Sequence, residues 1–410
     1  PFGVVAISGQ GLPQQLALTL TAGLIEDSLL VEGDRDLLGV TRRLLELSGI
    51  GPCPFAGMLL SDMGADVVRV DGPNSASLGL RLPIERDVVA RGKRSIVIDL
   101  KQPQGTQALL LLCRSADVLI EGFRPGVMER LGLGPQAVLA ENPALIYGRL
   151  TGWGQCRPFE PRAGHDINYL AISGALHAIS PRDRPPSVPL NLIADYAGGS
   201  LFLVSGILAA LFEAKRSGQG QVVDAAMLDG AALLTTMFHG LLAAGLWRDE
   251  RQSNLLDGGC FFYRAYETQD GESLALGPLE AKFFQELVTT LGVPPAELPQ
   301  GDPSRWPELE AKLEALIKTK TRDEWAALFE PTDACVSPVL SLREAPEHPH
   351  NRARGVFETR FGVTQPAPAP RFSETPASLT TSPVAAGTNT AEALAAWGIT
   401  DIDSLLADGV

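Results

Sequence analysis

The sequence lacks the features of a disulfide-stapled or zinc-binding protein. Its five cysteines are odd in number and widely spaced, and no two of them form a C-x-x-C pair. This pattern excludes a disulfide framework and a zinc finger, and it favours a reducing compartment. The two histidines of His348-Pro349-His350 have no further ligands at zinc spacing nearby. We therefore expect no metal site.

The sequence also has few long apolar runs and no basic residue among its first 34 positions. The first basic residue is Arg35, so the basic start of a secretory signal is missing. The most apolar stretches, 201–212 and 231–247, are interrupted by polar residues and glycine. They fall short of the roughly 18 apolar residues of a membrane span and are expected to be buried helices. We expect a cytoplasmic protein that does not act at a membrane.

Positive charge is in deficit overall. Thirty-four Lys and Arg residues face 48 Asp and Glu residues, giving a formal net charge of −14. This argues against nucleic acid or an anionic membrane as the main partner. An anionic small molecule is still possible, because Arg91-Gly92-Lys93-Arg94 is locally basic. At 410 residues, two domains are the default.

The first half of the chain predicts a parallel sheet. Residues 43–47 and 65–71 read as strands that flank a helix over 55–63, which is a β-α-β unit. Further strands are predicted over 95–99, 116–120, 144–150 and 222–226. A dinucleotide fingerprint counted from Gly49 places Pro54 where its third glycine belongs. Binding of NAD or FAD is therefore not expected.

Basic residues near these strands suggest a phosphate-bearing ligand. They occur in three loops, which we expect at the carboxyl edge of the sheet, where open α/β sheets bind ligands. The alternative for any one of them is solvated surface charge. The residues are Arg69, Arg91, Lys93, Arg94 and Arg124.

The second half predicts another kind of sheet. Residues 261–267 and 273–276 flank Asp270-Gly271 and read as an antiparallel hairpin. The helices expected around it form a second α/β domain, and the segment 365–383 reads as an extended linker. These helices span 281–291, 306–319 and 322–328. A helix over 228–247 comes before the hairpin, and closing helices are expected over 391–397 and 401–406.

The most informative stretch runs from Gly164 to Gly199. His165 and Asp195 each stand at an expected helix start, before apolar periodic runs. Helix starts offer unpaired N–H groups and the positive end of the helix dipole, which suits proton transfer. Spacing alone leaves a second interpretation open, in which the acidic residues at these two helix starts are only N-caps.

Several motifs in fixed order resemble the CoA-transferase family III, and within it the α-methylacyl-CoA racemase branch. The resemblance covers the chain from about residue 38 to the C-terminus and leaves 1–37 unassigned. The matching segments are 47–52, 64–71, 116–126, 151–155, 164–169, 189–195 and 218–224.

The resemblance implies a fold and an assembly. It implies an α/β protein with a Rossmann-like large domain, built from both chain ends, and a smaller inserted α/β domain. It also implies an interlocked homodimer whose active site lies between subunits. The implied segments are a large CoA-binding domain (38–225), a linker helix and loop (226–262), a small domain (263–355) and a return segment (356–410).

The resemblance also implies residue roles. His165 and Asp195 match the two acid/base residues, and Glu280 matches a small-domain glutamate that pairs with the histidine. The backbone N–H of Asp166 is our candidate donor to an enolate oxygen. Tyr169 joins the basic residues as an expected coenzyme A contact. Gly72 and a short insertion before Arg91 depart from the family pattern, which affects the phosphate contacts.

The expected activity is inversion of the C2 stereocentre of 2-methyl-branched acyl-CoA thioesters in lipid and fatty acid metabolism. Two opposed proton carriers would act through an enolate, with no cofactor besides the coenzyme A of the substrate. The first alternative is a CoA transferase with Asp195 as nucleophile. The second is a non-catalytic acyl-CoA binder. Acyl-chain preference does not follow from the sequence.

Overall fold

The computed structural model describes residues 42–73, 82–155 and 158–399. The expected extension over 1–37 and the expected closing helix over 401–406 lie outside these residues. The described residues belong to one compact unit. Within it, a large parallel sheet and a small antiparallel sheet have separate hydrophobic cores and are described in turn.

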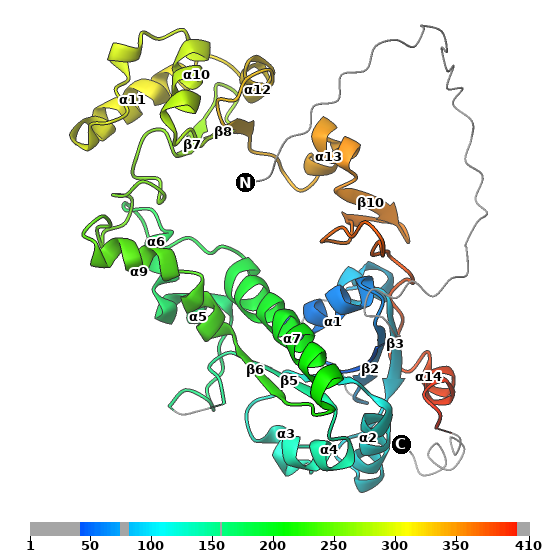
Figure 1. The fold of residues 1–410 in the computed structure, drawn as a ribbon. Helices are drawn as coiled ribbons and strands as arrows, with labels where there is room; N and C mark the ends of the chain where they lie inside the picture. The colour runs from blue at the N-terminus through cyan, green and yellow to red at the C-terminus, as the bar shows by residue number, and fades with distance from the viewer. Residues whose placement is uncertain (1–41, 74–81, 156–157, 400–410) are drawn as a thin grey trace, which may run out of the picture. The chain divides into compact units, whose positions relative to one another are not determined.

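The large sheet has six parallel strands in the order β3-β2-β1-β4-β5-β6. Figure 1 labels β2, β3, β5 and β6 of this sheet. The order reverses between β1 and β4, which is where open α/β sheets bind ligands. The prediction of a parallel sheet is confirmed. The strands are β1 (Arg43–Leu47), β2 (Asp66–Asp71), β3 (Lys93–Val97), β4 (Val118–Glu121), β5 (Ile146–Thr151) and β6 (Val222–Ala226).

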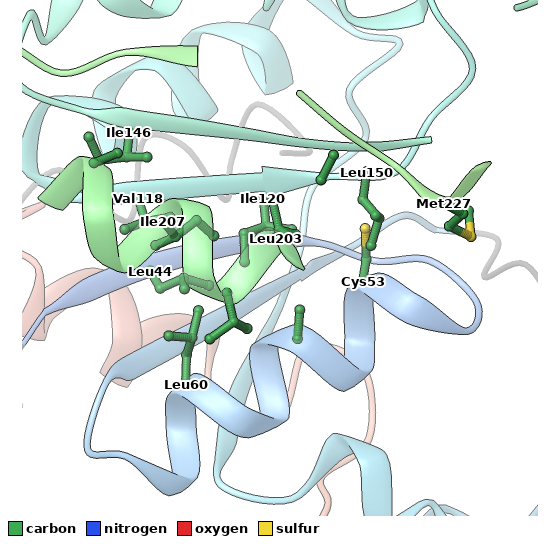
Figure 2. Close-up of a cluster of buried hydrophobic side chains, with 14 of the residues drawn as sticks. Leu44, Cys53, Leu60, Val118, Ile120, Ile146, Leu150, Leu203, Ile207 and Met227 are labelled. Carbon is green, nitrogen blue, oxygen red and sulfur yellow. The ribbon is translucent and has the colours of Figure 1, made fainter. Parts of the chain in front are cut away.

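Both faces of this sheet are buried. Successive strand residues point to opposite faces, so Leu44 packs in one core and Leu45 in the other. Figure 2 shows the first core, where Leu203 and Ile207 face residues of β1, β4 and β5. The helices of the first core are α1 (Pro52–Asp62), α5 (Asp166–Ser173), α7 (Phe202–Ser217) and α8 (Met227–Leu233). Those of the second are α2 (Pro103–Ser115), α3 (Val127–Arg130), α4 (Pro135–Glu141) and α14 (Thr390–Ala396).

The C-terminal segment returns to the large sheet. The side chain of Asn389 accepts the backbone N–H of Ser95 in β3 at 3.2 Å. The indole Nε1 of Trp397 donates to Asp66 at the start of β2 at 2.8 Å. The last described helix, α14, is therefore attached to the strand edge opposite β6.

The helix predicted over 228–247 is two helices, α8 and α9 (Thr236–Ala243). The break coincides with Thr235 and Thr236, whose hydroxyls donate to the carbonyls of Ala232 and Leu233. Hydroxyls that bond to preceding carbonyls compete with regular helix hydrogen bonding. The short helices α6 (Ala175–Ala178), η1 (Ile84–Arg86) and η2 (Val88–Ala90) complete this part.

The small sheet is antiparallel, as the hairpin prediction required. Strands β7 (Arg264–Glu267), β8 (Ser273–Leu276) and β9 (Val336–Pro338) pair in that order. Helices α10 (Ala281–Leu291), α11 (Trp306–Ile317) and α12 (Arg322–Phe329) pack on it around a core of its own. Shorter elements are η4 (Pro295–Glu297), η5 (Pro303–Arg305), η6 (Ala345–Glu347), α13 (Pro349–Arg354), β10 (Phe357–Arg360) and β11 (Val363–Pro366).

One continuous helical stretch among the described residues, Leu192–Ser217, has the length and hydropathy of a membrane-crossing helix. It consists of a π-helical segment, η3 (Leu192–Leu201), followed directly by α7. Leu203 and Ile207 of this stretch are fully buried in the core. One face of this stretch therefore packs in the core.

Candidate active site

A cavity of about 940 Å³ opens beyond the carboxyl ends of β1, β4 and β5. His165 and Asp195 both line it, together with the loops that follow these three strands. The cavity therefore lies at the point where the strand order reverses. The structure brings the two predicted proton carriers into one site.

His165 is the N-cap residue of α5, as predicted. Its backbone N–H donates to the side chain of Asn168 at 3.0 Å, which fixes the first turn of the helix. The preceding Gly164 has no room for a side chain, because a Cβ there would lie 2.8 Å from the Tyr169 ring and 2.9 Å from Trp153. The histidine itself is exposed at the cavity.

The prediction that Asp195 stands at a helix start is confirmed, but Asp195 is not the N-cap residue. It lies in the first turn of η3, whose N-cap is Asn191. Segments of π-helix are rare and occur often at functional sites. Burial raises the pKa of the Asp195 carboxyl to about 6, and the neighbouring Asp166 adds to this. A hydrogen bond from the Asn191 side chain and the proximity of His165 partly oppose the shift.

Asp166 connects the two proton carriers. Its side chain is buried, and Oδ2 accepts the backbone N–H groups of Ala194 and Asp195 at 2.8 Å each. Its own backbone N–H belongs to the first residue of α5, a position that has no acceptor within the helix. The amide that we predicted as an enolate donor is therefore at a helix N-terminus on the cavity wall.

Tyr169 forms part of the wall. Its ring contacts Trp153 edge-on, with centroids 4.7 Å apart, and leaves no space for a side chain at Gly152. Burial, Asp195 and Asp166 raise the pKa of the Tyr169 hydroxyl to about 12. The hydroxyl therefore stays protonated at neutral pH.

Among the predicted basic contacts, Arg124 lines the cavity. Its loop follows β4 and is held by Glu121, whose carboxylate accepts the Phe123 backbone N–H at 2.8 Å and pairs with Arg149 at 2.8 Å. Arg124 is thus presented from a fixed loop at the predicted edge of the sheet.

The prediction that the other basic loop shares this edge is wrong. Lys93 and Arg94 begin β3, and Arg91 precedes them, so all three lie at the amino end of that strand. Each is in a structural ion pair: Arg91 with Asp62, Lys93 with Glu46 and Arg94 with Asp66, at 2.6 to 2.7 Å. Lys93 is fully buried.

Arg69 is also engaged elsewhere. It lies within β2, where its guanidinium pairs with Asp71 at 2.8 Å and donates to the Val384 carbonyl at 3.2 Å. None of these four residues lines the cavity as described. Of the basic residues predicted to bind a phosphate-bearing ligand at this edge of the sheet, only Arg124 lines the cavity.

Comparison with known proteins fits this geometry. Residues 40–390 match the profile described as CoA-transferase family III. The chain belongs to this family. It is 47% identical to the mouse alpha-methylacyl-CoA racemase over 337 residues and 48% identical to the human one over 336 residues. Each match covers 82% of this chain and 86% of the relative.

Solved structures of the CoA-transferase family III share the fold. A CAIB/BAIF family protein from Brucella suis matches with a TM-score of 0.74 and 26% identity, over 87% of this chain and 98% of that one. Rv3272 from Mycobacterium tuberculosis matches with a TM-score of 0.70 and 28% identity, over 85% of this chain and 97% of that one. The mixed α/β architecture with a central parallel sheet is common to the family.

Glu280, the third predicted catalytic residue, lies outside the cavity as described. It is the N-cap residue of α10 in the part of the chain that carries the small sheet. Its pairing with a histidine stays a prediction.

Sequence reasoning missed two side chains of this family III site. Asn191 bonds to Asp195, and the carboxylate of Asp166 holds the backbone of Asp195. Asn191 stands in the matched Pro-Leu-Asn-Leu segment, which was the one available signal for it.

Proposed function

We propose that this chain is an α-methylacyl-CoA racemase, an isomerase that inverts C2 of 2-methyl-branched acyl-CoA thioesters. The observation that carries the proposal is the pairing of His165 with a carboxyl of pKa about 6 in one cavity. The identity of 47 to 48% to two racemases supports it.

The proposed reaction is a two-base proton transfer. Neutral His165 removes the C2 proton from one face, and protonated Asp195 delivers a proton to the other; the reverse direction exchanges these roles. An ordinary aspartic acid titrates near 3.9 and would rarely hold a proton at neutral pH. The raised pKa of Asp195 keeps a useful fraction of both its forms near pH 6 to 7.

The enolate between the two transfers carries its charge on the thioester oxygen. We assign its stabilisation to the backbone N–H of Asp166 at the start of α5, supported by the positive end of the helix dipole. Arg124 and Tyr169 are proposed to contact the coenzyme A part of the substrate, which is the only coenzyme the reaction needs. The side chains of His165 and Asp195 carry out both proton transfers, and the backbone amide only donates a hydrogen bond to the enolate oxygen.

The proposed assembly is an interlocked homodimer in which the Glu280 of the partner subunit orients His165. Support comes from the exposed apolar side chains in α8 and α9 and in the residues that directly follow each helix. Helix α9 has no buried residue, and an apolar surface of this kind marks an interface. The exposed residues are Leu233, Leu234, Met237, Leu242 and Leu246.

One experiment separates the proposed function from its alternatives. A single epimer of a 2-methylacyl-CoA is incubated with the protein in deuterated water, with and without a free carboxylic acid. A racemase incorporates deuterium at C2 and forms the other epimer. A transferase moves coenzyme A to the free acid, and a binder does neither. Absence of deuterium incorporation contradicts the proposal.

A further inference from the structure

The carboxylate of Asp166 contacts the segment that carries Asp195, although no step of the proposed reaction uses it. One of its oxygens accepts two backbone N–H groups, those of Ala194 and Asp195, at 2.8 Å each. Its other oxygen, Oδ1, is buried and has no hydrogen-bond partner among the described residues. A buried carboxylate with an unpaired oxygen is costly, so its presence at a cavity wall needs a reason.

We infer that Asp166 is a positioning residue that fixes Asp195 opposite His165 and keeps its carboxyl protonatable. This rests on the proposed function.

The positional effect follows from connectivity. Asp166 is the covalent neighbour of His165 and opens α5, while its side chain holds the first turn of η3. One residue therefore ties the histidine-bearing helix start to the backbone of Asp195. Charge-assisted hydrogen bonds to backbone N–H groups are short and strong, which suits this task.

The electrostatic effect follows from proximity. The charged or titratable groups near the Asp195 carboxyl are His165 at the N-cap of α5 and Asp166 and Tyr169 within it, and the Asn191 amide bonds to it. From α1, the Gly51 backbone approaches Asp195, since a Cβ at Gly51 would lie 3.5 Å from its Oδ2. Asp166 is the only negative group in this set, and a like charge disfavours ionisation.

The test compares two variants. Asp166→Asn keeps an oxygen that can accept the backbone N–H groups but removes the charge, whereas Asp166→Ala removes both. The control is Asp117→Asn, because Asp117 also accepts a backbone N–H, that of Arg43 at 2.9 Å, but stands before β4 at the opposite edge of the sheet.

The first measurement is the pH profile of C2 deuterium exchange. With the epimer from which Asp195 removes the C2 proton, the acid limb reports Asp195. For Asp166→Asn we expect its midpoint to fall by roughly half a pH unit or more, with KM nearly unchanged. For Asp166→Ala, we expect kcat to fall about 10- to 100-fold with KM within about threefold, because small misplacements of reacting groups are costly. Asp117→Asn should retain the parent profile. An unshifted midpoint in Asp166→Asn together with parental kcat in Asp166→Ala overturns the inference.

The second measurement does not depend on activity. Asp195→Asn is introduced into the parent and into Asp166→Asn, and the unfolding midpoint temperature is measured at pH 7.5 and pH 4. At pH 7.5, Asp195→Asn should raise the unfolding midpoint temperature clearly less in the Asp166→Asn background than in the parent. At pH 4 the two backgrounds should no longer differ in this respect. Equal rises in both backgrounds contradict the inference. If the parent shows no exchange, the proposed function fails, and this cycle still decides whether Asp166 acts on Asp195.

Discussion

At the scale of single residues, the site depends on how environment changes ordinary side chains. Asp195 is half-buried beside a second carboxylate, and its pKa rises to about 6. Asp270 is exposed and accepts hydrogen bonds from Thr268 and Arg322, and its pKa is lowered. The same residue type is therefore a proton carrier in one place and a permanent anion in the other. The sequence identifies the aspartates but does not reveal which of them is buried.

The first residue-scale prediction concerns His165. His165→Ala should lower C2 deuterium exchange about 100-fold or more, because general acid–base catalysis contributes that range. The fold should be retained, since the histidine is exposed and its cap bond uses the backbone. Far-ultraviolet circular dichroism and exchange rates check both parts. His177→Ala is the control, because His177 is an exposed histidine on α6; a parental exchange rate in His165→Ala would remove His165 from the mechanism.

The second residue-scale prediction concerns how the free energy of unfolding depends on pH. The carboxyl of Asp195 has a folded pKa of about 6 against roughly 3.9 when unfolded, so the native state binds more protons between these values. The free energy of unfolding therefore falls as pH rises from about 4 to about 6. Asp195→Asn removes this effect and should stabilise the protein by about 1 to 2 kcal/mol above pH 6, after allowance for partial exposure.

Urea unfolding at pH 4 and pH 7.5 measures this second effect. The variant should gain stability only at the higher pH. An equal gain at both would mean that the Asp195 carboxyl is not the titrating group.

At the scale of elements, the position of η3 depends on a close contact with α8. A Cβ on Gly230 would lie 1.9 Å from the Gly198 carbonyl oxygen, and a Cβ on Gly198 would lie 2.7 Å from the Ala231 backbone nitrogen. The two helices meet backbone to backbone, which only glycine allows. The π-helical turn that carries Asp195 thus rests on a partner distant in sequence.

The sequence predicted the elements that depend on local patterns, and it missed those that depend on contacts between distant segments. Strands such as 43–47 were predicted to the residue because their apolar runs are local signals. The wide turn at Asp195 was missed because it depends on the contact with Gly230. Lys93 was assigned to the wrong edge of the sheet, because a loop that enters a strand lies at the opposite edge from a loop that leaves it. Its ion pair with Glu46 is a tertiary contact, which the local sequence does not reveal.

The element-scale prediction follows from the glycine contact. Gly230→Ala should destabilise the protein by about 1 to 3 kcal/mol, in the range of overpacking, and should lower exchange by displacing Asp195. Gly301→Ala is the matched control, because a Cβ there meets nothing within 4 Å. Denaturant unfolding and deuterium exchange are measured for both variants. Equal stabilities for the two would show that the backbone contact is not tight.

At the scale of the whole molecule, the cavity gathers segments that are far apart in the sequence. The loop after β1, the loop after β4 with Arg124, the start of α5 and the start of η3 all line it. Parallel topology produces this meeting, because the carboxyl ends of all strands lie at one edge. The β-α-β pattern in the sequence is enough to predict that these segments meet. The contribution of the proposed partner subunit does not follow from that pattern.

The last prediction tests the assembly. Helix α9 exposes Met237 and Leu242, and burying each such side chain contributes about 1.5 to 3 kcal/mol, so a charge at this surface should weaken a dimer strongly. The parent should sediment at twice 43.6 kDa, and Leu242→Arg should shift it toward the single chain. Leu111→Arg on α2 introduces the same charge at another exposed leucine and should remain dimeric. Because the proposed site needs Glu280 of the partner subunit, exchange activity should be lost in parallel with the dimer and recover at high protein concentration. A monomeric parent with full activity would refute the shared site, and the catalytic pair would then have to work within one chain.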